Sequence, residues 1–347
     1  MQRGVVFGLM GRLPIILWRE HGQCWLALLS LYGLTLWAMI TVNFLLPRAM
    51  PGDPINAFFD PGSLSYLAAE DLRARLARYY GLDLPLGEQY LAYLGNLLHG
   101  NLGWSISLQA PVAELIAAHL PWTLLLAVPS VLLSTGASLL LGGHAGWVRG
   151  THSDRFLSFA FVALGTVPVY LIGIALLLLF SVRLGWLPLS GSQTTFRVYG
   201  GPIDHLWDLL THLVLPVCSL TLTMIGRDFL LARTSMVTVL GEDFMLVARA
   251  KGLSDKALKY RHGLRNALLP VFTHFALKMG TVVTTTVLVE TLFAYPGIGR
   301  LMFNAVASRD YPVLEGCFLV AGLMVLLANL AADITYRWID PRIGRIT

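Results

Sequence analysis

The chain has 347 residues, of which 56% are hydrophobic and 13% are charged, and its mean hydropathy is +0.66. Soluble domains carry about 25% charged residues, so this composition excludes an ordinary soluble domain and indicates a membrane protein. The net charge of +5 does not indicate nucleic-acid binding. The positions of the charged residues along the chain are what carry information.

The N-terminal region predicts a short extension followed by a first membrane span. Residues 1–24 contain Arg3, Arg12 and Arg19, and we interpret them as a cytoplasmic or interfacial extension with a short helix at the membrane surface. The uncharged run 25–46 is longer than the apolar part of a signal peptide, and no small-residue cleavage site follows it. This run is therefore predicted to be retained as a span.

Six segments have the roughly 20 mainly apolar residues that a spanning helix needs. They are residues 25–46, 120–142, 156–180, 209–231, 271–293 and 313–332. The third is uncharged throughout and is the clearest, whereas the fifth is the weakest because it contains Lys278 and Glu290. The predicted fold is an all-α polytopic membrane protein with six spans. Residues 120–338 hold spans two to six, and residues 339–347 form a tail.

The Lys and Arg residues predict the orientation. Sixteen of them lie on the side of the two termini, whereas the two short opposite loops hold only Arg183, Arg197, Arg300 and Arg309. Cytoplasmic loops are enriched in such residues. Both termini and the basic segment 233–270 are therefore predicted to be cytoplasmic.

The first external segment, residues 47–119, is too long for a bare connection. Apolar residues at helical spacing predict one helix that ends before Gly81 and a second that follows Pro85 and ends before Gly100. Their apolar positions are Leu67, Leu72, Leu76 and Tyr80, and then Tyr90, Leu91, Leu94, Leu97 and Leu98. The two helices would cover the outer mouth of the bundle, with a simple spacer as the alternative.

The basic segment has the pattern of a helix, a glycine and a second helix. Acidic residues at 242 and 243 suit a helix start, and Gly252 stands where a left-handed residue would end that helix. Ser254 is a suitable N-cap for the second helix, and Pro270 fits the start of the next span. A single apolar stripe is predicted on the second helix: Ala257, Tyr260, Leu264 and Leu268. The segment is predicted to dock on a partner, although a loop whose charge only holds the topology is the alternative.

The order of residues in this segment resembles a known family. Residues 248–253 read ARAKGL and residues 261–270 read RHGLRNALLP, which is similar to the EAA loop of ABC importer permeases in the peptide/nickel branch. Further resemblances lie at residues 51–54, 80–86, 89–90, 100–103, 184–191, 290–293, 295–301, 309–312, 333 and 340–342. Two departures are Leu246, where the general pattern has Glu, and a longer gap from Gly252 to Pro270, which suits this branch.

The resemblance implies a type I ABC importer permease in a bacterial inner membrane. It implies a second homologous permease, two ATP-binding subunits and an external solute-binding protein as partners, with ATP and magnesium bound by the partners and no cofactor in this chain. The typical cargo of the branch is a di- or oligopeptide, and nickel or a metallophore complex is the alternative. The residues implied to couple to the ATP-binding subunit are Ala248, Arg249, Ala250, Lys251, Gly252, Leu253, Arg261, His262, Arg265 and Asn266.

The fifth span contains polar residues that are candidates for the translocation path. Charges inside a bilayer are functional hypotheses by default, so Lys278 is a candidate for substrate preference. The alternative is a buried Lys paired with Asp228 or with the partner permease. Thr281, Thr284 and Thr285, next to Thr286, either line a water-filled path or bond back to carbonyls of their own helix. Glu290 is interpreted as a structural hydrogen-bonding residue.

The sequence lacks the motifs of ATP hydrolysis, of hydrolytic enzymes and of metal binding. The sequence contains no GxxxxGK[ST] phosphate loop, so this chain is not predicted to hydrolyse ATP, and it contains neither GxSxG nor HExxH. Cys24, Cys218 and Cys317 have no metal-ligand spacing and are interpreted as packing residues. The rival functions are a secondary transporter or channel, which predicts broken helices at mid-membrane, and a membrane scaffold, which predicts that polar residues of span five tolerate apolar replacement.

Overall fold

The computed structural model describes residues 30–46, 48, 84–105 and 107–339, with side chains described up to residue 331. The chain divides into two compact units, residues 1–51 and 52–347. In the first unit the described helix is Ser30–Leu46, with exposed apolar side chains such as Leu34 and Trp37. This helix lies within the predicted first span, of which residues 25–29 are outside the described residues.

The described part of the second unit is helical. Its elements are α3 (Leu86–Leu98), α4 (Val112–Trp147), α5 (His152–Thr166), α6 (Val169–Leu176), the π-helix η2 (Leu177–Arg183), α7 (Pro202–Leu240), α8 (Asp243–Ala250), the π-helix η3 (Ala257–Leu264), α9 (Arg265–Leu292), α10 (Ile298–Ala307) and α11 (Tyr311–Ile339). The predicted helix after Pro85 is confirmed as α3, and no residue of α3 is buried. The first predicted helix of the external segment lies outside the described residues.

Four described helices are long and apolar enough to cross a membrane. They are Val112–Trp147, Pro202–Leu240, the continuous helix Ala257–Leu292, and Tyr311–Ala331, the part of α11 whose side chains are described. They contain the predicted spans two and four and nearly all of spans five and six. A fifth candidate is the bent pair of α5 with α6 and η2, so the count of six spans remains a prediction.

The predicted third span is not one uninterrupted helix. Helix α5 ends at Thr166 and the next helical segment begins at Val169, with a bend of 100° between them. The physical cause is Pro168, because proline disfavours helical geometry in the residue before it, and Val167 is extended with ψ 127°. Hydrophobicity alone predicted a membrane-crossing length and could not reveal this break.

Helices α4 and α7 are joined by polar contacts as well as by apolar packing. The Ser138 hydroxyl donates to the Ile225 carbonyl at 3.2 Å, and the Thr221 hydroxyl donates to the Ser130 carbonyl at 3.4 Å. Ser130 and Ser138 are fully buried. Small residues and hydrogen bonds between helices are the usual means of helix association in membranes, so α4 and α7 form a tightly packed pair.

Helix α5 packs on α7 through glycine and through an ion pair. A Cβ atom at Gly226 would clash with the Phe161 carbonyl and with Gly165, so the two backbones are in close contact. Near the start of α5, the Asp154 carboxylate accepts two hydrogen bonds from Arg233, at 2.6 and 2.8 Å. These contacts fix the first half of the bent pair on the bundle.

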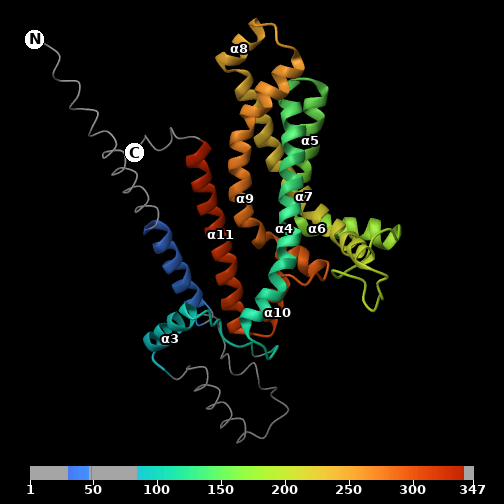
Figure 1. Ribbon diagram of the computed structural model, residues 1–347. Helices are drawn as coiled ribbons and strands as arrows, with labels where there is room; N and C mark the ends of the chain where they lie inside the picture. Colours follow the sequence, from blue (N-terminus) through green and yellow to red (C-terminus); the bar gives the residue numbers. More distant parts are fainter. Residues whose placement is uncertain (1–29, 47, 49–83, 106, 340–347) are drawn as a thin grey trace, which may run out of the picture. The chain divides into compact units, whose positions relative to one another are not determined.

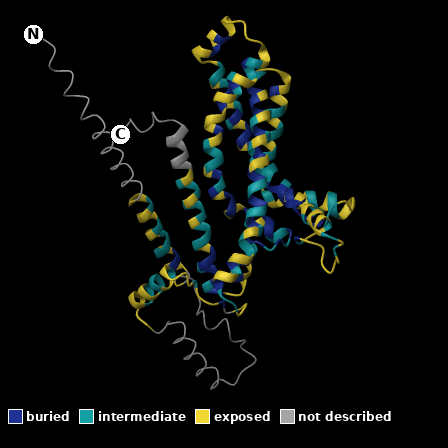
Figure 2. Ribbon diagram, viewed as in Figure 1, coloured by how far each residue is buried: buried dark blue, intermediate teal, exposed yellow. Residues whose placement is uncertain are grey.

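The two ends of the long helices carry different elements. Helix α8, η3 and the turn between α4 and α5 lie at one end, and α10 lies at the other end (Figure 1). Helix α8 is exposed over most of its surface (Figure 2).

Candidate functional site

The glycine between α8 and η3 has the conformation that the sequence predicts. Gly252 has φ +74°, in the left-handed region where residues with a Cβ are strained. Its N–H donates to the Arg249 carbonyl at 2.9 Å, and the Leu253 N–H donates to the Ala248 carbonyl at 3.5 Å. This is the pattern of a Schellman C-cap, so the end of α8 is fixed in position.

The start of the second helix is also as predicted. The Ser254 hydroxyl accepts a hydrogen bond from the Ala257 N–H at 3.4 Å, and the Ser254 carbonyl accepts one from the Leu258 N–H at 2.9 Å. Ser254 is therefore the N-cap. Only three residues, Gly252 to Ser254, separate the C-cap of α8 from the residues of the next helix, so the two helices are joined by a short turn.

The second helix differs from the prediction in register and in length. Its first part, η3, is a π-helix, which has more residues per turn than an α-helix. Its buried residues are therefore Leu258 and Gly263, whereas Tyr260 is exposed. The predicted stripe is not the side that packs on the bundle: Leu268 is also exposed, and Ala257 and Leu264 are half-buried. Whether the stripe contacts a partner remains a prediction.

Pro270 does not begin the fifth span. It lies inside α9, which is continuous with η3 as one helix over Ala257–Leu292. The missing N–H of Pro270 removes one hydrogen bond to the carbonyl of residue 266, but it does not interrupt the helix. The second helix of the basic segment is therefore the beginning of the spanning helix itself.

The helix–glycine–helix element packs on the ends of α4 and α7. Met245, Ala248 and Leu258 form a buried apolar cluster with Trp147 and Val239. In addition, the Lys259 ammonium lies 2.7 Å from His144 Nδ1. The element is therefore held against the bundle by its buried side and leaves the other side uncovered.

The uncovered side carries most of the residues implied to couple to an ATP-binding subunit. Ala248 is buried and His262 is half-buried. The other eight are exposed: Arg249, Ala250, Lys251, Gly252, Leu253, Arg261, Arg265 and Asn266. Exposed apolar side chains accompany them: Phe244, Leu246, Val247, Leu253 and Tyr260. We call the exposed residues of α8, η3 and their connection the basic elbow.

Lys278 is buried and paired inside the bundle. Its ammonium donates to Asp228 of α7 and, at 3.1 Å, to the Ser134 hydroxyl of α4. Ser134 also donates to Asp228 at 2.5 Å, and His274 Nε2 lies 3.4 Å from the other Asp228 oxygen. The alternative that Lys278 pairs with Asp228 is therefore confirmed, and the pair joins three helices.

The threonines of α9 bond to their own helix, as the second alternative predicts. The hydroxyls of Thr281, Thr284 and Thr285 donate to carbonyls three residues earlier, at 3.3, 2.7 and 2.7 Å. All three residues are exposed on this chain, whereas Thr286 is buried. Their exposure leaves the prediction that they line a path untested.

Glu290 fastens the beginning of α10 to α4. Its carboxylate accepts from the Thr123 hydroxyl at 2.8 Å and from the Arg300 N–H at 3.1 Å, and Thr123 accepts from the Ile298 N–H at 2.8 Å. Burial raises the pKa of the neighbouring Tyr295 hydroxyl, and the Glu290 charge raises it further. The interpretation of Glu290 as a structural hydrogen-bonding residue is confirmed.

Two members of the Lys278 cluster were not predicted from the sequence, although signals for them exist. Ser134 belongs to a series with Ser130 and Ser138, spaced four residues apart on one face of α4. His274 precedes Lys278 by four residues and therefore lies on the same face of α9. Polar residues repeated at helical spacing in an apolar run indicate a contact with another helix.

Among the described residues, no group of three or more His, Cys, Asp or Glu could hold a metal ion.

Comparison with known proteins decides the family. The family described as binding-protein-dependent transport system inner membrane component matches residues 138–345, which include α7 to α11 and the basic elbow. The chain belongs to this family. Its relatives are ABC importer permeases, so the resemblance to the peptide/nickel branch is confirmed.

Curated relatives match along nearly the whole chain. The Di/tripeptide transport system permease protein DppB of Pseudomonas aeruginosa is 35% identical over 90% of this chain and 95% of its own length. The Oligopeptide transport system permease protein AppB of Bacillus subtilis is 36% identical over 87% of this chain and 93% of its own. The Dipeptide transport system permease protein DppB of Escherichia coli K12 is 32% identical over 87% and 93%.

Membership of this family fixes the general class of the protein. The chain is a multi-pass membrane permease subunit, and permease subunits of such transporters are not themselves catalytic. The rival class of secondary transporters is therefore excluded, although the bend at Pro168 is the kind of broken helix which that class predicts.

Proposed function

We propose that this chain forms half of the translocation path of an ATP-driven importer for di- or oligopeptides. The cargo is inferred from the printed names of the relatives, which are di/tripeptide, dipeptide and oligopeptide permeases. A second, homologous permease forms the other half. Two ATP-binding subunits, which hold ATP and magnesium, and an external solute-binding protein complete the transporter in the bacterial inner membrane, with both termini of this chain in the cytoplasm.

The observation that carries this proposal is the continuity of the basic elbow with the fifth span. η3 and α9 are a single helix, Ala257–Leu292, and Lys278 and the exposed threonines lie on that helix. A displacement of its first turns is therefore transmitted along the helix axis to the candidate path. In our proposal, ATP binding closes the ATP-binding subunits, the elbow moves with them and the path opens outward, and ATP hydrolysis resets it.

The chemistry of the elbow suits a groove on a protein partner. Exposed apolar residues such as Leu246, Leu253 and Tyr260 supply surface to be buried, and exposed cations such as Arg249 and Lys251 orient the partner. A segment whose charge only maintained topology would not require exposed leucines beside a fixed C-cap. This combination favours docking over the alternative of a simple positive loop.

Co-purification tests the docking. The chain is expressed with its second permease and ATP-binding subunits, and the expected result is that Leu253→Asp loses the ATP-binding subunit while Leu253→Met retains it. Gly252→Asp is expected to act in the same direction, with added backbone strain because of its φ of +74°. Thr195→Asp, at an exposed loop residue before α7, serves as a control for added charge. Full retention of the ATP-binding subunit by Leu253→Asp and Gly252→Asp would refute the docking assignment.

Uptake assays test the cargo. Whole cells that carry the complete transporter are expected to accumulate labelled dipeptide, and unlabelled peptide is expected to compete for that uptake. Accumulation of nickel or of a metallophore complex without peptide competition would support the alternative cargo instead.

A further inference from the structure

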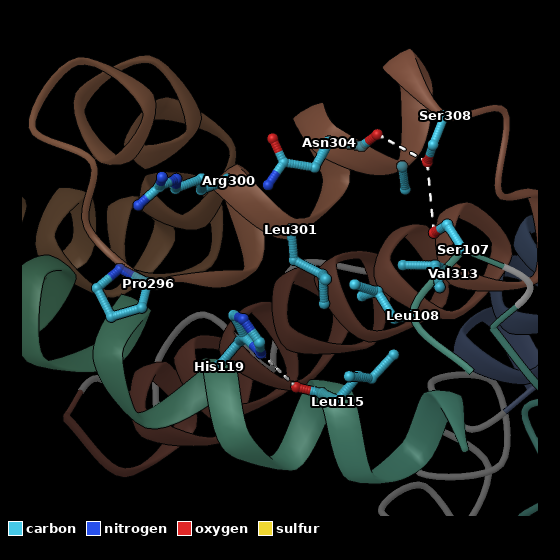
Figure 3. A pocket seen from close by; sticks show the side chains of 11 residues that line it. Ser107, Leu108, Leu115, His119, Pro296, Arg300, Leu301, Asn304, Ser308 and Val313 are labelled. Atoms are coloured by element: carbon cyan, nitrogen blue, oxygen red, sulfur yellow. Dashed lines mark hydrogen bonds between the residues drawn. The ribbon is translucent and has the colours of Figure 1, made fainter. Parts of the chain in front are cut away.

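A cavity of about 270 Å³ lies at the end of the bundle that carries α10. Segments far apart in the sequence build it: residues 107–119 on one side, and Pro296, α10 and the start of α11 on the other (Figure 3). Its apolar lining includes Leu108, Leu115, Leu301 and Val313. The described residues of this chain are therefore sufficient to form the cavity.

The polar groups of the cavity select an anion. Arg300 lies over Pro296 at one end, Ser107 and Ser308 lie at the other, and Asn304 and His119 lie between the two ends (Figure 3). One N–H of the Arg300 guanidinium donates to the Ala294 carbonyl. The other four of its five N–H donors remain for a ligand. Among the described residues that line the cavity, Arg300 is the one permanent cation, and none is Asp or Glu.

A carboxylate that contacts the lining of the cavity is already engaged. Asp310 accepts hydrogen bonds from the Ser105 hydroxyl at 2.7 Å, from the Ser107 N–H at 2.9 Å and from the Ser107 hydroxyl at 2.7 Å. These bonds hold the wall of the cavity beside α11. On the facing side, His119 Nδ1 is bonded to the Leu115 carbonyl at 2.7 Å, and the Glu290 contacts hold the start of α10. The segments that form the cavity are therefore held in place by hydrogen bonds.

The size of the cavity suits a small group that carries a carboxylate. Pockets that enclose a drug-sized ligand have volumes of about 300–1,000 Å³, so a cavity of about 270 Å³ does not enclose an extended oligopeptide. It is large enough for one acidic side chain, with the apolar lining against its methylene groups. A side chain presented by another protein fits this volume, and a free dipeptide is the other occupant that the test below distinguishes.

The position of the cavity indicates which protein presents that side chain. Leu115 and His119 belong to the first turns of α4, whereas Trp147, at the other end of α4, packs against the buried side of the helix–glycine–helix element. The 32 helical rises from Leu115 to Trp147 amount to about 48 Å, which exceeds the roughly 30 Å hydrocarbon core. The cavity and the elbow thus face opposite sides of the membrane, and the family is dependent on a binding protein.

We propose that this cavity receives an acidic side chain of the external solute-binding protein when that protein docks on the transporter. The inference rests on the proposed function, because it uses the cytoplasmic position of the elbow to make the cavity external. Arg300 and Asn304 hold the carboxylate, and the apolar lining holds the stem of the side chain. In this proposal the cavity is a docking socket for another protein.

The test measures docking on the complete transporter in lipid nanodiscs. The probe is the purified solute-binding protein of the same transport system, loaded with peptide and labelled with a fluorophore, and the readout is its dissociation constant. Asn304→Asp places a negative charge in the socket and is expected to weaken docking at least about tenfold. Asn304→Lys, which has the same position and the opposite charge, is expected to leave docking unchanged or stronger, and Thr195→Asp is expected to leave it unchanged.

Three results would overturn the inference. Unchanged docking of Asn304→Asp would show that the cavity is not a contact, and equal weakening by Asn304→Asp and Asn304→Lys would exclude recognition of a carboxylate. Binding of free labelled dipeptide to the wild-type transporter and its loss in Asn304→Asp would assign the cavity to cargo. Basal ATP hydrolysis of the same nanodiscs separates these results from a failure of the proposed function, because a chain that does not assemble with ATP-binding subunits gives no such hydrolysis.

Discussion

Lys278 of α9 and Ser134 of α4 donate to the same carboxylate oxygen of Asp228 on α7. Lys278 and Asp228 are both buried, so the pair is shielded from water within the bundle. Loss of either member of such a pair leaves the other charge buried without compensation.

Removal of one partner of this pair is expected to be costly. Lys278→Met leaves the Asp228 charge buried without its cation and should lower the free energy of unfolding by about 3–5 kcal/mol. Denaturant titration of the detergent-solubilised chain measures the change. The double variant Lys278→Met/Asp228→Leu removes both charges and is expected to recover much of the loss. A single variant as stable as the wild type would contradict the pairing.

Lys278→Gln tests a separate question, the selection of cargo. The Lys278 ammonium already donates hydrogen bonds to Asp228 and Ser134. We therefore expect this variant to lower the amount of folded transporter but to leave the preference among labelled peptides unchanged. Uptake normalised to the transporter content of the membrane measures this. A changed preference would mean that Lys278 contacts cargo in another state of the transporter.

The contact between Gly165 and Gly226 predicts a position that tolerates no side chain. Gly226→Ala would place a Cβ against the Phe161 carbonyl and Gly165, and overpacking of this kind costs about 1–3 kcal/mol. Gly136→Ala in α4 is the matched control, since nothing lies near its Cβ position and alanine favours a helix by about 1 kcal/mol over glycine. Melting temperatures in detergent should therefore fall for the first variant and not for the second. A reversed order would refute the close packing of α5 on α7.

The hydrogen bonds of Glu290 predict a local effect at α10. Glu290→Ala leaves the Arg300 N–H without its acceptor, and an unsatisfied buried group costs about 1–3 kcal/mol. Hydrogen exchange of the amides at the start of α10 is expected to accelerate, while exchange in the middle of α7 stays slow. Uniform acceleration throughout the bundle would indicate global unfolding and would contradict a local fastening.

The two hydrogen bonds between Arg233 and Asp154 predict that lysine is a poor replacement for arginine. Arg233→Lys keeps the charge but loses the paired geometry, and we expect it to destabilise the contact of α5 with α7 by about 1 kcal/mol. Arg233→Ala should cost more, because Asp154 is then buried without its cation. Denaturant titration of the two variants compares them, and equal stability of Arg233→Lys and the wild type would show that the charge alone suffices.

The positions of the long helices could be predicted from the sequence, because a bilayer demands about 20 apolar residues regardless of neighbouring helices. The break at Pro168 could not be predicted. Pro129 and Pro216 lie in equally apolar runs, yet α4 and α7 continue through them. Whether a proline ends a helix depends on which groups pack around the freed carbonyl, and this is tertiary information.

The elbow shows the same division between local and tertiary information. Gly252 and Ser254 could be predicted as C-cap and N-cap because capping depends on the residue and its near neighbours. The π-helical register of η3 could not, since Leu258 and Gly263 reach the bundle only when the helix is wound more loosely. Lys278 offered two possible partners, and its choice of Asp228 required the positions of α7 and α9.

The contact of Lys278 with Asp228 crosses the boundary between two groups of helices. Lys278 lies on the helix that begins in the elbow, whereas Asp228 and Ser134 belong to α7 and α4, which are bonded to each other. Any sliding of α9 past that pair must therefore rupture or exchange a buried charge contact. Such a contact resists small displacements of α9 and breaks only when the displacement is large enough to separate the two charges. In the proposed mechanism, motion that enters at the elbow is therefore expected to proceed in discrete steps, with the helices staying in register during brief thermal fluctuations.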